Sequence, residues 1–316
     1  MRKNLVIGFA SNYEWKDIRF WVNSLQKTGY SGDIHIVSDN MKRETIEKLS
    51  SKNVKLSLYG KQNENGDFVA EQSIAPHVNR FFYIWNAIKD MNSTGPDGYE
   101  HVVTTDVRDV VFQSDPITWL EENLGVYSLV ASSEGLKYQD EPWGNKNLYD
   151  AFGPYYHNLL KDNLIYNVGV IGGDFYYVRG LLSLIFQLSI NRPIQIVDQA
   201  VYNYLINTDP ISTNTMFTSN KDGWAIQLGT TLDAVRCGSG DLGQAYINNK
   251  AAQHKYLEAY VDDPVIIEDG IVKDLEKKPY CIVHQYDRIH YLDMKLEQLY
   301  GDNDVSESRT TFHHPV

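Results

Sequence analysis

The chain has few cysteines and no long apolar run. Its 316 residues include 2 cysteines, Cys237 and Cys281, which stand far apart with no histidine partner nearby. This spacing argues against a disulfide scaffold and against a zinc motif, and it fits a reducing compartment. The N-terminal apolar run is too short for a signal peptide, and residues 180–190 fall short of a membrane-spanning length. We therefore expect a cytoplasmic protein with no transmembrane segment.

Positive charge is also scarce. The 29 Lys and Arg residues face 41 Asp and Glu residues, giving a formal net charge of −12. Neutralising nucleic-acid phosphates requires a basic face, so the charge argues against a nucleic-acid partner. An acidic protein still binds a nucleotide when a divalent cation bridges the two negative partners. The 42% apolar content is ample for a folded core.

Glycine-rich phosphate-binding loops are missing. The expected first strand, residues 5–9, runs into the sequence Gly8-Phe9-Ala10-Ser11-Asn12-Tyr13. A Rossmann dinucleotide fingerprint needs several glycines here, and no GxxxxGK[ST] motif occurs in the chain. Both facts argue against hydride transfer and P-loop phosphoryl transfer. The ring of Phe9 or Tyr13 is a candidate for stacking on a nucleobase, with a plain structural role for Phe9 as the alternative.

Strand and helix patterns alternate along the first hundred residues. The apolar spacing predicts strands at 5–9, 34–37 and 54–58, helices at 18–25, 40–50 and 76–89, and a loop at 60–73. This order predicts an α/β fold with a mostly parallel sheet and helices on both faces.

The pattern changes after residue 125. We expect strands at 126–131 and 168–171, a long aromatic loop at about 135–155, helices at 176–190 and 196–206, and short strands and loops ending in a strand at 280–284. No repeat or linker divides the chain. We expect a single domain over residues 1–300, with a nucleotide-binding half (about 1–115), an acceptor and metal half (about 116–300) and a polar tail (301–316).

Two carboxylates follow a buried strand in the segment HVVTTDVRDVVFQSDP, residues 101–116. The apolar pair Val102-Val103 is followed by Asp106 and Asp109. Open α/β sheets bind ligands at the carboxyl ends of their strands. Carboxylate oxygens suit Mg²⁺ or Mn²⁺ carrying a substrate diphosphate. The alternative is a solvated acidic turn in which Asp109 pairs with Arg108 or with a nearby helix terminus.

Two basic residues are candidate partners of these carboxylates. His284 ends a late apolar strand, where it is either a structural histidine or a neutral imidazole that completes a carboxylate-rich Mn²⁺ site. Arg80 lies near the start of the helix expected from residue 76. It either reaches a diphosphate or fixes an acidic loop.

Two further segments carry candidate sugar-binding groups. Asp198 and Gln199 begin a helix, where Asp198 serves either as its N-cap or, with Gln199, as a partner of sugar hydroxyls and of charge at an anomeric carbon. The strand from Asn167 ends in Gly172 and Gly173. Glycines there allow a ligand to come close, although an ordinary strand exit explains them equally well.

Taken in order, these segments resemble the GT-A family of nucleotide-sugar glycosyltransferases, in particular those of large algal viruses and related plant-like and bacterial proteins. The matching pieces are the N-terminal strands, TTDVRDVVFQSDP, NVGVIGG, VDQAVYNYL and IVHQYDR, spanning roughly residues 4 to 288. The resemblance implies a Rossmann-like GT-A fold and transfer of a hexosyl or deoxyhexosyl group from a UDP-sugar to a glycan or glycoconjugate acceptor. The acidic motif of the family is usually Asp-x-Asp. Here the spacing is Asp106-x-x-Asp109, so we expect Asp109 on the metal and Asp106 on ribose or metal.

The resemblance also implies roles for individual residues. The Mn²⁺ or Mg²⁺ ligands are Asp106, Asp109 and His284. The nucleotide-sugar contacts are Phe9, Ala10, Ser11, Tyr13, Arg80, Asp106, Val107, Asn167, Gly172 and Gly173. The catalytic candidates are Asp198, Gln199 and Glu134.

The late histidine and the Asp-Gln helix start resemble retaining rather than inverting GT-A enzymes. A retaining route lets the leaving phosphate deprotonate the acceptor, whereas an inverting route needs a carboxylate base such as Asp198, Glu134 or Asp174. Nucleotide-sugar synthesis is a competing class, but its glycine-rich loop is missing. A non-catalytic carbohydrate-binding protein that uses the Tyr- and Trp-rich segment 138–155 is another. The sequence leaves the oligomeric state open.

Overall fold

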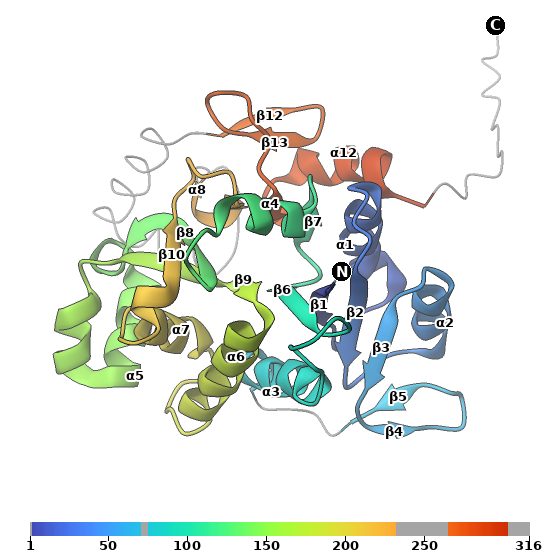
Figure 1. The fold of residues 1–316 in the computed structure, drawn as a ribbon, viewed down its shortest axis with the longest axis horizontal. Coiled ribbons are helices and arrows are strands. Elements are labelled where there is room, and N and C mark those ends of the chain that lie inside the picture. Colours follow the sequence, from blue (N-terminus) through green and yellow to red (C-terminus); the bar gives the residue numbers. More distant parts are fainter. Residues whose placement is uncertain (1, 71–74, 232–264, 303–316) are drawn as a thin grey trace, which may run out of the picture.

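The computed structural model describes residues 2–70, 75–231 and 265–302, and it centres on a seven-stranded sheet (Figure 1). The strand order is β10-β8-β9-β6-β1-β2-β3. The bounds are β1 (Lys3–Phe9), β2 (Asp33–Ser38), β3 (Lys55–Leu58), β6 (Tyr99–Thr105), β8 (Leu129–Lys137), β9 (Leu164–Asp174) and β10 (Thr215–Thr218). Strand β9 runs antiparallel to both of its neighbours, and every other adjacent pair is parallel. The predicted mixed, mostly parallel sheet is therefore confirmed.

Both faces of the sheet are buried, as the continuous apolar strands predict. Leu5 and Ile7 of β1 point into one core cluster, and Val6 points into another. The first cluster includes side chains from α3 (Pro76–Ile88), α6 (Phe175–Ser189) and α7 (Asp198–Ile206). The second includes side chains from α1 (Trp15–Lys27), α2 (Arg43–Ser51) and α4 (Pro116–Asn123). The predicted helices on both faces are confirmed (Figure 1).

A second, three-stranded sheet includes the strand that follows β6 in the sequence. It consists of β11 (Ala225–Gln227), β14 (Ile282–His284) and β7 (Val110–Phe112), with β14 in the middle. Its register sets His284 opposite Val110 on one side and beside Gln227 on the other. Because Asp109 directly precedes β7, this small sheet brings His284 to the acidic turn.

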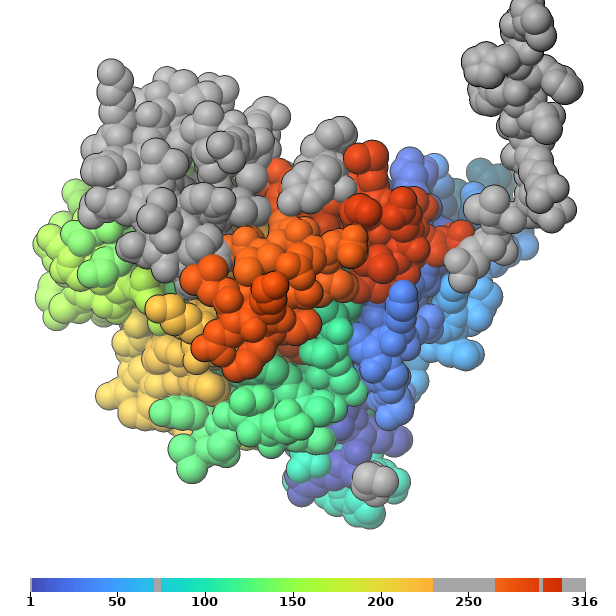
Figure 2. All heavy atoms as spheres, turned by 90° about the horizontal axis from the view of Figure 1, so that it is seen from above, coloured from blue at the N-terminus to red at the C-terminus, as the bar shows by residue number. Residues whose placement is uncertain are grey.

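The C-terminal elements pack together on one face. They are the hairpin β12 (Ile266–Glu268) and β13 (Ile271–Lys273), and the helix α12 (His290–Tyr300). Figure 2 shows them in orange and red next to the blue N-terminal segments, and α12 contacts α1. Most of the predicted polar tail lies outside the described residues, as does Cys237. None of the helices described here is long and apolar enough to cross a membrane.

The prediction of a loop at about 135–155 is wrong, because most of this segment is helical. Strand β8 extends to Lys137, and α5 (Pro142–Leu160) follows. The side chain of Glu141 accepts hydrogen bonds from the first-turn amides, and Pro142 occupies the first helical position. A kink at Gly153, with φ of 72°, precedes Pro154. The sequence also failed to predict α12, the short α8 (Leu228–Thr231) and the small hairpin β4 (Lys61–Gln62) and β5 (Phe68–Val69).

Candidate metal and donor site

The acidic turn after β6 is held in place by backbone hydrogen bonds. The amide of Asp106 donates to the carbonyl of Gly169 on β9 at 2.8 Å. The amide of Gln285, just after β14, donates to the carbonyl of Asp109 at 2.7 Å. The two carboxylates are therefore fixed between the large sheet and the small one.

His284 joins these carboxylates. Its Nε2 lies 3.6 Å from Asp106 Oδ2 and 3.6 Å from Asp109 Oδ1. The ligand atoms of the three residues all lie within 4.8 Å of one another. Neighbouring ligands of an octahedral ion with bonds near 2.1 Å stand about 3 Å apart, so a small contraction adapts this group to a divalent ion. Two carboxylates and one imidazole are a suitable donor set for Mn²⁺.

The imidazole of His284 is buried. Burial lowers its pKa below the ordinary value, against the opposing effect of the Asp109 carboxylate. A metal ligand must offer a lone pair from a neutral ring, and this environment favours that form. Its Nδ1 lies 2.6 Å from the Oε1 atom of Gln227.

Arg80 of α3 links the acidic turn to α7. Its Nη1 pairs with Asp106 Oδ1, and its Nη2 pairs with Asp198 Oδ2 at 2.9 Å. The N-cap of α7 is Val197, so Asp198 does not cap the helix. The Oδ1 atom of Asp198 is buried and has no hydrogen-bond partner among the described residues. Arg80 thus contacts the acidic turn in the structure, and its contact with a diphosphate stays a prediction.

Glu134 of β8 forms a second polar cluster with two amides. Its Oε1 accepts from Asn167 Nδ2 at 2.7 Å and from Gln199 Nε2 at 3.1 Å. Burial raises the pKa of Glu134 to about 7, although both amides favour the charged form. Three residues predicted from separate segments are thus in direct contact.

The two clusters meet at Gly169. A Cβ atom built on this residue would lie 2.5 Å from His284 Cε1, 2.8 Å from Asp106 Oδ2 and 2.8 Å from Asn167 Oδ1. Only glycine fits there without displacing these side chains, because real Cβ atoms do not approach other atoms so closely. The candidate metal ligands Asp106, Asp109 and His284, called the metal group below, therefore adjoin the Glu134 cluster.

Two predicted aromatic residues lie near the ends of the central strands. The ring of Phe9 stacks on that of Tyr83, with centroids 5.5 Å apart and planes inclined by 3°. Tyr13 lies within the electrostatic influence of Asp109, and its pKa is raised mainly by burial.

Three other residues predicted to contact the nucleotide-sugar differ in how far they are buried. Ala10 is buried where β1 ends, and its amide donates to the carbonyl of Val37 at 2.9 Å. Ser11 is half-buried in the loop that follows. Val107 points into the core, so only its backbone is available to a ligand.

The predicted Gly172 and Gly173 lie away from the site. Because β9 is antiparallel to β6, they pair with residues inside the sheet, and Asp174 pairs with His101 near the opposite edge. A Cβ on Gly172 would meet the Trp224 ring at 2.9 Å, so close packing accounts for this glycine. The structure does not bring these glycines to the metal group, and it places the candidate base Asp174 outside the site.

Asp39 is a candidate that the sequence reasoning missed. It follows β2, is 4% exposed, and its Oδ1 is buried without a hydrogen-bond partner among the residues described. Its charge contributes to a raised pKa of Tyr83, whose ring stacks on Phe9, although burial is the larger cause. The signal was available, because Asp39 follows an apolar strand in the same way as Asp106 does.

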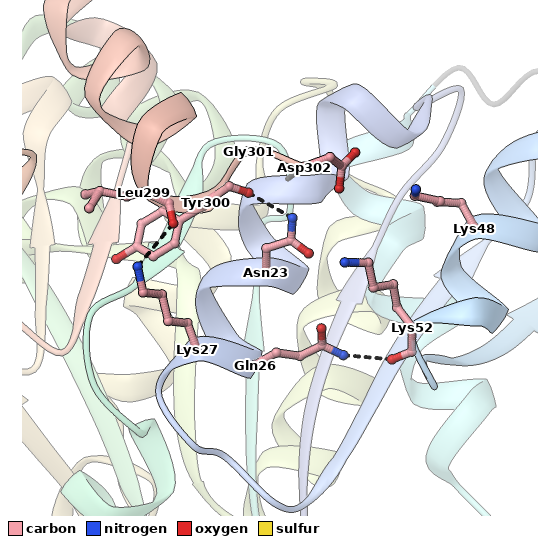
Figure 3. Close-up of a pocket in the computed structure, with 9 residues that line it drawn as sticks. All are labelled: Asn23, Gln26, Lys27, Lys48, Lys52, Leu299, Tyr300, Gly301 and Asp302. Carbon is pink, nitrogen blue, oxygen red and sulfur yellow. Dashed lines mark hydrogen bonds between the residues drawn. The ribbon is translucent and has the colours of Figure 1, made fainter. Parts of the chain in front are cut away.

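A separate hollow of about 400 Å³ lies among α1, α2 and the end of α12 (Figure 3). Lys27, Lys48 and Lys52 contribute to its lining. Lys27 Nζ donates to the carbonyl of Leu299 at 3.2 Å. This hollow shares no residue with the carboxylate cluster.

Comparison with known proteins supports the fold. No family model matches the chain, and no curated protein sequence matches it. The apo structure of the WbbM bifunctional glycosyltransferase matches with a TM-score of 0.50 and 13% identity over 94% of this chain and 51% of that one. The chain thus spans about half the length of that protein. The galactosyltransferase LgtC, in complex with donor and acceptor sugar analogs, matches with a TM-score of 0.50 and 10% identity over 93% of this chain and 95% of that one.

These matches confirm the predicted GT-A fold. The narrower resemblance to enzymes of large algal viruses stays a prediction. The chain has the mixed α/β fold of GT-A glycosyltransferases.

Proposed function

We propose that the protein is a metal-dependent glycosyltransferase that moves a sugar from a UDP-sugar to a hydroxyl group of a glycan or glycoconjugate. The observation that carries this proposal is the convergence at Gly169. A metal-ligand group and a buried polar cluster meet there at the carboxyl edge of a GT-A sheet. The first suits a diphosphate, and the second suits the hydroxyl groups of the attached sugar.

Asp106, Asp109 and His284 would hold Mn²⁺ or Mg²⁺. When bound, such an ion neutralises charge that develops on a diphosphate leaving group. The Arg80 guanidinium lies beside Asp106 and adds a second positive group that suits phosphate oxygens. A bound ion and Arg80 would together offset the negative charge of Asp106, Asp109 and Asp198, so that a negatively charged donor is not repelled there.

Asp39 and the Phe9–Tyr83 pair support uracil as the base. The rings offer an apolar stacking surface. The buried Oδ1 of Asp39, which has no hydrogen-bond partner among the described residues, would accept a hydrogen bond from uracil N3–H, a donor that cytosine lacks. We expect Asp39→Ala, which removes the acceptor, to weaken UDP binding about 10- to 100-fold, since bonds to charged groups contribute about 1.5–3 kcal/mol. Calorimetry with UDP and CDP tests this, and equal affinities for both in the wild type would exclude the assignment.

For the stereochemistry we propose retention, as the resemblance implies. Asp198 and Gln199 would then orient the donor sugar, and the leaving phosphate would deprotonate the acceptor. Inversion is the second candidate, because Glu134 has a pKa of about 7, the range of an effective general base. The anomeric configuration of the first product, read by proton NMR, decides between the two.

The activity is tested by incubation with a panel of UDP-sugars, with and without Mn²⁺. Mass spectrometry should find a released or transferred sugar that requires Mn²⁺ and disappears in Asp109→Asn. The exposed Asp162 provides a matched control, Asp162→Asn, which should keep the activity. Glycan binding with no turnover of any donor would favour the carbohydrate-binding alternative.

A further inference from the structure

A chain of buried hydrogen bonds runs from His284 away from the carboxylates. His284 Nδ1 lies 2.6 Å from Gln227 Oε1, and Gln227 Nε2 donates to Ser132 Oγ at 2.9 Å. Ser132 Oγ in turn donates to the carbonyl of Ala225 at 3.0 Å. The side chains of Ser132 and Gln227 are fully buried. This series of hydrogen bonds thus joins β8, β11 and β14.

The direction of each bond follows from its end point. A carbonyl oxygen only accepts hydrogen bonds, so the Ser132 hydroxyl donates its hydrogen to the carbonyl of Ala225. Its oxygen then accepts from the amide nitrogen of Gln227, which turns Gln227 Oε1 toward His284. That oxygen also only accepts, so Nδ1 of His284 carries the proton. In a neutral ring Nε2 is then left with a lone pair.

The lone pair faces the two carboxylates. Nε2 lies 3.6 Å from Asp106 Oδ2 and from Asp109 Oδ1. Without the hydrogen bond to Gln227, these negative oxygens would favour a proton on Nε2 of His284, and that proton would prevent metal ligation. The buried amide therefore opposes the tautomer that the carboxylates alone would select.

We propose that Gln227 and Ser132 are positioning residues that hold His284 in its Nδ1–H tautomer and so present Nε2 to a divalent ion. The metal-binding part rests on the proposed function, while the tautomer is a property of the metal-free protein. Ser132 acts through Gln227 by fixing which way the amide points. Gln227 acts directly on the ring.

Nitrogen NMR of metal-free protein labelled at its 9 histidines tests the tautomer. The His284 signals, identified by their loss in His284→Gln, should show a protonated Nδ1 and an unprotonated Nε2. Gln227→Met removes the acceptor and should move the proton toward Nε2. Gln113→Met is the matched control, because Gln113 is a half-buried amide bonded to the backbone of Val272 and Tyr280. It should leave the His284 signals unchanged.

Calorimetry with Mn²⁺ gives the second readout. We expect Gln227→Met to bind Mn²⁺ about 10- to 100-fold more weakly, as is usual when the partner of a metal-bound histidine is lost. Ser132→Ala keeps Gln227 but frees its amide to turn, so it should show a mixture of tautomers and a smaller loss. This second variant keeps the test decisive if Gln227→Met does not fold.

The proposal is overturned if metal-free wild type carries the proton on Nε2. It is also overturned if both variants keep the wild-type tautomer and affinity. A wild type that shows the expected tautomer and binds no Mn²⁺ would overturn the proposed metal site and leave the tautomer assignment standing.

Discussion

Gly169→Ala should disable the metal group while the fold persists. The new Cβ would lie 2.5 Å from His284 Cε1, whereas carbon atoms in contact stand about 3.5–4.0 Å apart. The ring must therefore retreat by about 1 Å. The Asp106 Oδ2 atom, at 2.8 Å, must also move by about 0.5 Å. Both movements exceed the tolerance of about 0.2 Å in metal–ligand distances.

Two measurements follow from these displacements. Mn²⁺ affinity, measured by calorimetry, should fall about 100-fold or more, because two of the three ligands are displaced together. The free energy of unfolding in urea should fall by about 1–3 kcal/mol, as is typical of overpacking. The two losses are separable because the metal measurement is made where the variant is fully folded.

The matched control is Gly180→Ala in α6. A Cβ on Gly180 meets no atom of the described residues within 4 Å, so this substitution should stabilise the helix by about 0.5–1 kcal/mol and leave Mn²⁺ binding unchanged. If Gly169→Ala bound Mn²⁺ as tightly as the wild type, the geometry derived for the metal group would be refuted.

Two further predictions concern buried charges. The pKa of Glu134 is raised from 4.5 to about 7, so the folded state holds this proton more tightly than the unfolded state. The free energy of unfolding should therefore fall by about 3 kcal/mol as pH rises from about 4.5 to about 7, and Glu134→Gln should remove this dependence in urea titrations. Arg80→Ala leaves the buried Asp198 carboxylate without its partner and should destabilise the fold by about 3 kcal/mol. Adding Asp198→Asn should restore part of that loss, and equal stabilities for Arg80→Ala and the wild type would contradict the role of the pair.

The sequence predicted the parts of the site that follow apolar strands. Asp106, Asp109 and His284 each adjoin a short buried run, and strand ends of a mostly parallel sheet gather at one edge. Strand-end reasoning did not single out Glu134 and Asn167. These two residues were predicted only through the family resemblance. Their contact depends on the antiparallel register of β8 and β9.

Other features need the three-dimensional structure. Gly172 and Gly173 were predicted to lie close to a ligand. Because β9 is antiparallel to β6, Gly169 is instead the glycine at the site. Gln227 and Ser132 are single polar residues in apolar strands, and no spacing marks them. Helix α5 was hidden because Gly153 and its neighbouring proline interrupt the helical pattern.

The central claim is that a divalent ion held by Asp106, Asp109 and His284 binds the donor diphosphate. Calorimetry of UDP with and without Mn²⁺ tests it most directly, on the wild type, Asp109→Ala and His284→Ala. We predict UDP affinity that requires Mn²⁺ in the wild type and is lost in both variants. UDP binding that is independent of the metal and unchanged in both variants would contradict the account.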